Sequence, residues 1–236
     1  MNLLVVVAVL GVLVAVNLII NRWREWWYLQ ICLGGTAVLL LLARLSGASW
    51  SALGLAAGTW LTGLAWGAAC VVTVMGAYVI ALFVPAARTF FHDDGVDDLS
   101  ADDVRRRGLV MIPFGTVLLE EVAFRGVLFG VVRVDCGAAW AVLVSSVAFG
   151  LWHILPSLGL HTANLGVRAR LGAGRRAQVA TVTLSILGTA LAGAVFCLLR
   201  LGSGSLITPM ALHWAVNGVG LFFAWLAPRR RAASGR

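Results

Sequence analysis

Three apolar stretches of the chain contain polar and aromatic residues whose side chains are suited to hydrolysis. These polar and aromatic residues are Glu120, Glu121, Arg125, Phe149, His153, His213 and Asn217. A charged side chain in the middle of a bilayer costs roughly 3 kcal/mol on insertion scales and more in simulations. The retention of such residues therefore indicates either a function or mutual neutralisation.

Neutralisation accounts for part of this set. Glu121 and Arg125 are four residues apart, so they share one helix face and can form an ion pair. Glu120 lies about 100° further round the helix and is left free to face another partner. A single histidine in an apolar helix can equally be a hydrogen-bonded packing residue.

The spacing of the remaining residues favours a common site. Phe149 precedes His153 by four residues, and His213 precedes Asn217 by four residues. Each pair shares one face of its helix, so three helices are expected to direct polar groups into the interior of the bundle.

These groups match the needs of amide hydrolysis by an activated water molecule. A carboxylate held away from water is a stronger base than one in solution, which suits Glu120 to deprotonate the water. His153 can hold the same water or shuttle its proton. His213 and Asn217 can donate to the oxyanion, where one good donor contributes roughly 3–4 kcal/mol. No serine or cysteine is paired with these histidines in a recognisable motif, which disfavours a covalent nucleophile.

The three motifs, in their order, resemble those of the CPBP intramembrane proteases. They are Glu120-Glu121-x-x-x-Arg125, Phe149-x-x-x-His153 and His213-x-x-x-Asn217. The family includes the type II CAAX prenyl endopeptidases and bacterial ABI-like relatives, and the resemblance covers about 100 residues.

The resemblance implies an all-helical membrane core that hydrolyses a peptide bond inside the bilayer. In that case Glu120 activates the water together with His153, and His213 and Asn217 form the oxyanion site. Glu121 and Arg125, with Phe149, support them.

A metal-free mechanism is favoured, and a metal-dependent one stays open. The sequence has no HExxH zinc motif, and its four cysteines include no CxxC pair. Glu120, His153 and His213 could nevertheless supply the three ligands of a catalytic zinc ion.

The composition indicates which elements position these residues. Of 236 residues, 61% are hydrophobic and 12% are charged, against roughly 45–50% and 25% in a soluble chain. Disordered, collagenous and disulfide-scaffold classes are excluded. The fold class expected is all-α, a polytopic membrane helix bundle.

Apolar runs of about 20 residues predict about seven transmembrane helices, with six to eight possible. The predicted spans are 3–20, 28–45, 60–84, 108–132, 137–155, 177–199 and 206–227. The short stretch 46–58 is expected at the interface. The chain thus divides into a three-helix region with a long polar loop (1–107), a CPBP-like catalytic core (108–227) and a basic tail (228–236).

The long polar loop, 85–107, contains six aspartates followed by three arginines. The alternating acids and late glutamate of a calcium-binding EF-hand are absent, so a solvated loop is expected. Ser100 and Asp103 have the spacing of a capping box that begins the next helix.

The arginines predict the orientation. All eighteen cationic residues are arginine; fourteen fall in loops on one side of the predicted spans and three on the other, with Arg125 inside a span. The positive-inside rule therefore predicts an N-terminus outside and a C-terminus in the cytoplasm. The arginines form no continuous basic face, which disfavours nucleic-acid binding. Arginine without lysine, with much Ala, Gly and Val, is typical of a high-GC bacterial genome and suggests a bacterial plasma membrane.

The leading hypothesis is an intramembrane endopeptidase that needs no cofactor and acts on a peptide or protein in or at the bilayer. One alternative is a bacteriocin-immunity or peptide-binding membrane protein that keeps the pocket without cleaving. A second is a proton-coupled transporter, because intramembrane Glu and His residues also mark proton relays. The lack of an internal repeat disfavours the transporter.

Overall fold

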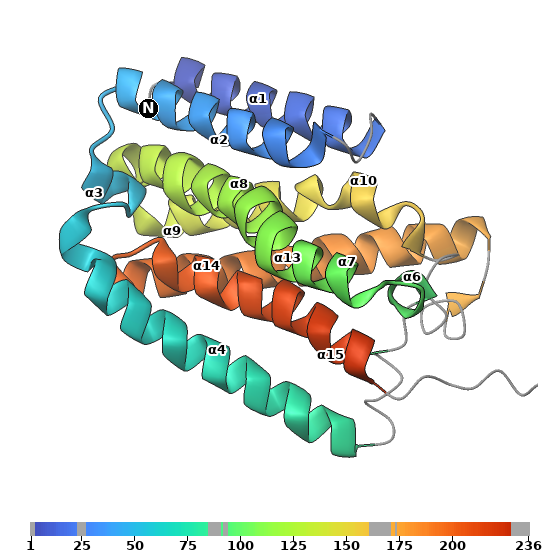
Figure 1. The fold of residues 1–236 in the computed structure, drawn as a ribbon. Helices are drawn as coiled ribbons and strands as arrows, with labels where there is room; N and C mark the ends of the chain where they lie inside the picture. The colour runs from blue at the N-terminus through green and yellow to red at the C-terminus, as the bar shows by residue number, and fades with distance from the viewer. Residues whose placement is uncertain are drawn as a thin grey trace, which may run out of the picture.

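The structure is a computed structural model that describes residues 3–22, 27–84, 91, 94–160, 171–172 and 174–227. All regular elements within these residues are helices, which confirms the predicted fold class (Figure 1). The predicted basic tail, 228–236, and four other loop arginines (Arg24, Arg88, Arg168 and Arg170) lie outside the described residues.

The first two helices form a pair along one edge of the bundle. Helix α1 (Leu3–Arg22) and helix α2 (Tyr28–Leu45) lie side by side at the top of Figure 1. Both agree with the predicted spans. The expected interfacial stretch follows as helix α3 (Trp50–Leu53) and the 3-10 turn η2 (Ala57–Thr59).

Helix α4 (Trp60–Phe83) forms the opposite edge of the bundle and packs on α14 (Ile207–Trp214) (Figure 1). Its buried positions are Gly63 and Gly67. A Cβ atom at Gly67 would lie 2.8 Å from Cβ of Ala211, so only glycine permits this approach. Small residues that let helix backbones approach closely are typical of membrane bundles.

The described part of the polar loop is partly helical. Helix α6 (Asp94–Asp97) precedes helix α7 (Ala101–Arg106). The Ser100 hydroxyl accepts from the Asp103 amide at 3.1 Å, and the Asp103 carboxylate accepts from the Ser100 amide at 3.3 Å. The predicted capping box is therefore confirmed, and it begins a helix that continues into the predicted fourth span.

That continuation is irregular. It runs through a π-helical stretch η4 (Arg107–Val117), one α-helical turn α8 (Leu118–Glu120) and a second π-helical stretch η5 (Glu121–Leu128). Pro113 inside η4 has no amide hydrogen to donate, which disrupts the regular hydrogen-bond ladder. π-helix is rare, appears mostly as single turns within α-helices, and is frequent at functional sites.

Helix α9 (Phe129–Trp152) combines two predicted spans. Gly137 inside it has φ 84° and ψ 174°, which is outside the helical region. The helix therefore breaks at Gly137, between the predicted fourth span and the predicted fifth span.

The chain ends with α10 (Ile154–Ser157), α13 (Arg175–Ser203), α14, the π-helical turn η6 (Ala215–Val219) and α15 (Gly220–Leu226). Helix α13 contains the predicted sixth span and extends beyond both of its ends, and the helices from α14 to α15 together match the predicted seventh span.

Arg200, expected in a loop, instead lies buried in the last turn of α13. Its Nη2 donates to the carbonyl oxygens of Ser51 and Ala52, at 3.1 and 3.2 Å. The prediction was wrong because it ended the helix where the apolar run ends, whereas α3 offers two carbonyl groups that accept from Nη2 of the buried guanidinium.

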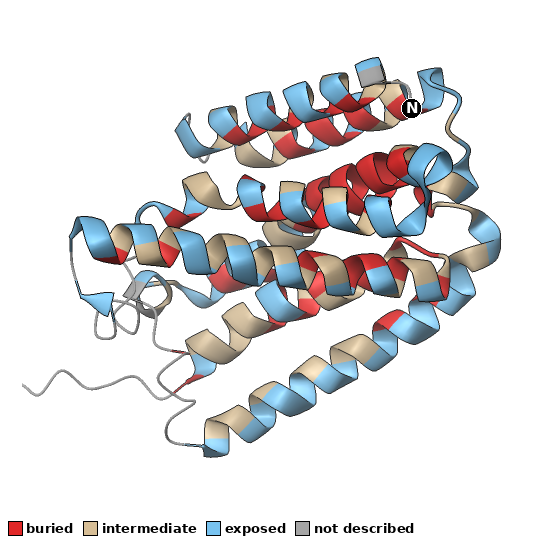
Figure 2. Cartoon of the chain, turned by 180° about the vertical axis from the view of Figure 1, so that it is seen from behind, coloured by how far each residue is buried: buried red, intermediate tan, exposed pale blue. Residues whose placement is uncertain are grey.

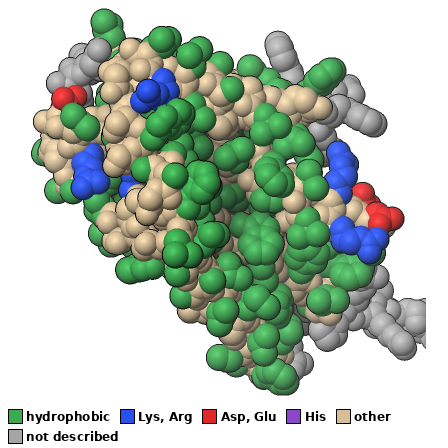
Figure 3. Space-filling model, turned by 60° about the vertical axis from the view of Figure 1, so that its left-hand side comes forward, with side chains coloured by type: hydrophobic (Ala, Val, Ile, Leu, Met, Phe, Trp, Pro, Cys, Tyr) green, Lys and Arg blue, Asp and Glu red, His purple; other side chains and the backbone are tan. Residues whose placement is uncertain are grey.

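The distribution of burial fits a membrane-embedded bundle. Six helical segments of the described residues are long and apolar enough to cross a bilayer, the longest being Ala101–Trp152 with its break at Gly137. The buried residues concentrate on the central helices, and the outer faces of α1 and α4 expose large apolar side chains (Figure 2). Charged side chains lie at opposite sides of the face in Figure 3, with apolar side chains between them.

Candidate active site

The two adjacent glutamates lie at the junction of α8 and η5, where the helix is most deeply buried. Glu120 is 6% exposed and Glu121 is fully buried. The two side chains both approach His213 and otherwise have different neighbours. Glu121 pairs with Arg125 on its own helix, whereas Glu120 faces residues of α9 and α14.

Glu121 is the centre of a buried hydrogen-bonded group. Its Oε1 accepts from Nη1 of Arg125 at 3.1 Å, which agrees with the expected pair. The same oxygen lies 2.7 Å from Nδ1 of His213. A cation from η5 and an imidazole from α14 thus meet at one carboxylate oxygen.

The guanidinium of Arg125 lies among aromatic rings. Its Cζ is 3.9 Å from the ring centroid of Phe149 and 4.8 Å from that of Phe196. Cation–π attraction increases when the cation is desolvated, and Arg125 is fully buried. Gly193 of α13 allows this packing, because a Cβ atom there would lie 3.2 Å from Nη2 of Arg125. Phe149 therefore lies directly against the cation that pairs with Glu121.

Glu120 has one oxygen occupied and one free. Oε1 accepts a hydrogen bond from Nε1 of Trp152 at 3.0 Å. Oε2 is buried without a hydrogen-bond partner and lies 3.8 Å from Nε2 of His213. A buried carboxylate oxygen with no partner is energetically costly and is usually explained by function or by a water molecule.

His213 bridges the two glutamates with its two ring nitrogens. Because Nδ1 must carry a proton to donate to Glu121, Nε2 of the neutral ring is an acceptor. Nε2 becomes a donor only when the ring is an imidazolium. The ring stacks on Phe196 with centroids 5.2 Å apart, which fixes its plane.

His153 lies at the C-terminal end of α9 and is half-buried. Its ring contacts Phe149 edge to face at 4.7 Å, which confirms that the two side chains share a face. Its Nδ1 lies 2.8 Å from the Phe149 carbonyl oxygen, so Nδ1 carries the proton and Nε2 is free to accept.

Asn217 differs from the other site residues because its side chain is exposed, whereas His213 is 4% exposed. The two residues were expected to face one groove. The helix changes from α to π after Trp214, so four residues no longer correspond to the same rotation as in a regular α-helix.

The candidate zinc ligands do not form a three-ligand site. Within the described ranges, no three His, Cys, Asp or Glu side chains are grouped so that they could hold a metal ion. Glu120 and His213 bring one oxygen and one nitrogen together, whereas a catalytic zinc ion takes three protein ligands. His153 instead points its Nδ1 at a backbone carbonyl group.

Two contributors were not found from the sequence. Trp152 bonds to Glu120, and Phe196 stacks on His213 and Arg125. Neither has a distinctive signal, because aromatic residues are common in apolar helices. Only the adjacency of Trp152 to His153 could have drawn attention to it.

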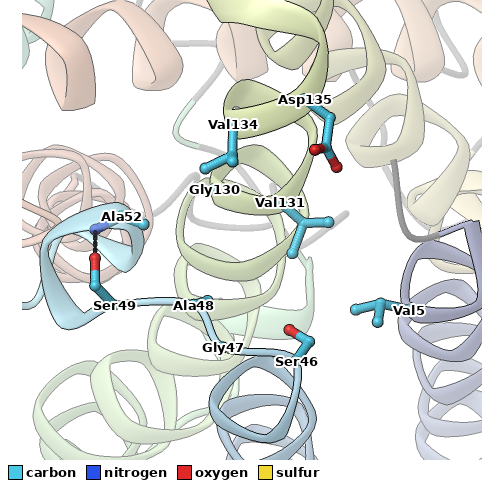
Figure 4. Close-up of a pocket in the computed structure, with 10 residues that line it drawn as sticks. All are labelled: Val5, Ser46, Gly47, Ala48, Ser49, Ala52, Gly130, Val131, Val134 and Asp135. Atoms are coloured by element: carbon cyan, nitrogen blue, oxygen red, sulfur yellow. Dashed lines mark hydrogen bonds between the residues drawn. The ribbon is translucent and has the colours of Figure 1, made fainter.

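A separate pocket of about 320 Å³ lies between the start of α1, the loop after α2 and the first two turns of α9 (Figure 4). Its lining includes Val5, Ser46 and Asp135, and none of the predicted site residues.

The fold and the buried ionisable group define a polytopic membrane protein with a polar centre inside its helix bundle. Residues 107–219, which contain all seven predicted site residues, match the family model described as type II CAAX prenyl endopeptidase Rce1-like. Nothing among curated proteins or solved structures matches the chain. This segment, just under half of the chain, is therefore similar to the Rce1-like family, and the match supports a membrane protease of the CAAX type as the general class.

Proposed function

We propose that the protein is a glutamate-dependent intramembrane endopeptidase, in which Glu120 activates the attacking water molecule. The observation that carries the proposal is the free Oε2 of Glu120, buried without a partner and 3.8 Å from the His213 imidazole. An unpartnered carboxylate oxygen in a water-poor site is suited to accept a proton from water.

The reaction then requires one proton to move twice. Oε2 of Glu120 takes a proton from the water, and the water oxygen bonds to the carbonyl carbon of the scissile peptide. Nε2 of His153 accepts a hydrogen bond from the other O–H of the same water, which stays on the oxygen. The C–N bond breaks as Glu120 returns its proton to the leaving nitrogen, which restores the carboxylate.

The oxyanion is stabilised from α14 and η6. Asn217 donates through its amide, and His213 donates through Nε2 when its ring is protonated. Glu121 and Arg125 hold the imidazole in place through the bond at Nδ1. Donors already oriented before the reaction contribute the most to stabilising a developing oxyanion.

We infer a substrate that is a peptide or protein in or at the membrane, because the site lies within helices long enough to span a bilayer. The bundle buries Glu120 and His213, so the substrate segment must reach them from within the bilayer or its interface.

The test compares the peptides of membranes and culture medium in cells carrying the wild type, Glu120→Gln or Asp102→Asn. Asp102 is a matched neutralisation control, because its side chain is 88% exposed and pairs only with a surface arginine. We expect cleavage products in the wild type and in Asp102→Asn, and uncleaved precursors in Glu120→Gln at equal protein levels.

Identical peptide profiles in all three strains would contradict the endopeptidase. A peptide-binding or immunity protein would give that result, since it needs the pocket but no base.

A further inference from the structure

The base proposed above is held by a residue outside the three motifs. Trp152, 6% exposed, donates its indole N–H to Oε1 of Glu120 at 3.0 Å. A glutamate carboxylate can otherwise rotate about its last torsion, which is broad and roughly two-fold. The bond at Oε1 fixes that rotation and leaves Oε2 directed at His213.

Trp152 is itself held from the first helix. Nδ2 of Asn17 in α1 donates to the backbone carbonyl oxygen of Trp152 at 2.8 Å. That carbonyl belongs to the last turn of α9, whose acceptors have no partner within the helix. Asn17 is 8% exposed, and its own Oδ1 accepts from Nδ2 of Asn21 at 2.6 Å one turn further along α1.

The indole is also fixed by packing on one side. Its ring contacts Phe124 of η5 edge to face at 5.8 Å. Together with Leu13 and Ala148, it borders a cavity of about 260 Å³ between α1 and α9. Because the indole already borders a cavity, replacing it by the smaller phenyl ring of phenylalanine is not expected to displace the neighbouring helices.

We propose that Trp152 is a positioning residue that orients Glu120, and that Asn17 holds Trp152 in place. The inference rests on the proposed role of Glu120 as the base. It assigns α1, which lies outside the segment that matches the family model, a part in the active site. The order of contacts is Asn17 to Trp152, and Trp152 to Glu120.

The kinetic test uses Trp152→Phe, which keeps an aromatic ring and removes the donor. A hydrogen bond to a charged group is lost, so we expect kcat to fall about 10- to 100-fold with KM nearly unchanged. Trp140→Phe is the matched control, because Trp140 lies on the same helix and is 59% exposed. It should leave kcat unchanged.

Asn17→Leu should also lower kcat, but by less than Trp152→Phe does, because it loosens the backbone of Trp152 and leaves the indole donor in place. Its control is Thr36→Val, which removes a buried hydroxyl bond to Cys32 within α2. Equal kcat values for Asn17→Leu and Thr36→Val would overturn the role of Asn17.

The spectroscopic test does not depend on activity. In protein labelled with ¹⁵N-tryptophan, the indole resonance of Trp152 is the one missing from Trp152→Phe. It should shift in Glu120→Gln, where the acceptor loses its charge, while the resonance of Trp140 should stay in place.

The two measurements separate the possible failures. An indole resonance that does not move in Glu120→Gln overturns the positioning role, whatever the kinetics show. A resonance that moves in Glu120→Gln, together with a wild type that has no hydrolytic activity, would keep the Trp152–Glu120 contact and refute the proposed function. An unchanged kcat in Trp152→Phe, with the wild type active, would show that Glu120 needs no orientation.

Discussion

Removal of the buried arginine tests whether the site residues form one electrostatic unit. Arg125 is fully buried and bonds to Glu121 at 3.1 Å, with its guanidinium 3.9 Å from the Phe149 ring. Arg125→Met keeps much of the volume and removes the charge, which leaves Glu121 with only His213 as a partner. Breaking a buried ion pair in this way costs about 3–5 kcal/mol. For a chain of this length that corresponds to a melting midpoint lower by on the order of 10 °C.

Thermal unfolding in detergent, followed by the fluorescence of the ten tryptophans, measures this change. Arg105→Met is the control, because Arg105 pairs with Asp102 at the surface and such pairs contribute at most about 1 kcal/mol. The double variant Glu121→Gln/Arg125→Met removes both charges and should recover a large part of the lost stability.

The reasoning is refuted if Arg125→Met melts at the same temperature as Arg105→Met. It is also refuted if the double variant is no more stable than Arg125→Met alone, because the cost would then come from packing.

Three further predictions concern other parts of the chain. Asn217→Ala should lower turnover about 10²–10³-fold without changing the melting midpoint, since the side chain is exposed; unchanged turnover would remove Asn217 from the oxyanion site. Gly54→Ala should lower stability by at least about 1–2 kcal/mol, because Gly54 has φ 77° and a Cβ atom there would overlap the Arg200 guanidinium. Gly58→Ala, with open space around the Cβ position, should melt at a higher temperature than Gly54→Ala. A reporter fused after Arg236 should be cytoplasmic, as the arginine asymmetry predicts, and a reporter active outside the membrane would reverse the orientation.

The helices could be predicted from the sequence because their length is set by a local requirement. An apolar run of about 20 residues crosses the hydrocarbon core, and every predicted span contains a helix in the structure. The π-helical stretches around Glu120 could not be predicted. Pro113 lies inside the first stretch and not the second, and hydrophobic periodicity does not distinguish a π-helical stretch from an α-helical one.

The site was predictable only where its contacts are local in sequence. Glu121 and Arg125 pair across one helical turn, and Phe149 contacts His153 across another. The contact of His213 with Glu121 joins residues that are distant in the chain, so only the fold reveals it.

The contacts of the supporting residues Asn17 and Trp152 are also between residues distant in the chain, so they could not be predicted from spacing. Asn17 and Trp152 are separated by 135 positions, and Trp152 and Glu120 by 32. No spacing rule connects such residues, and a tryptophan in an apolar helix has no distinctive pattern. Arg200 was misplaced for a related reason, because its acceptors on α3 come from a distant part of the chain.

The central claim is that the Glu120 carboxylate, without a metal ion, activates the water. The most direct measurement is the rate at which purified wild-type protein and Glu120→Gln hydrolyse a substrate identified by the peptide comparison. Both are assayed in detergent after exhaustive chelation, with bound metal measured in the same samples. The account predicts that the chelated wild type stays active and exceeds Glu120→Gln by at least about 10²-fold. A chelated wild type as inactive as Glu120→Gln, with activity restored by stoichiometric zinc, would contradict it and make Glu120 a metal ligand.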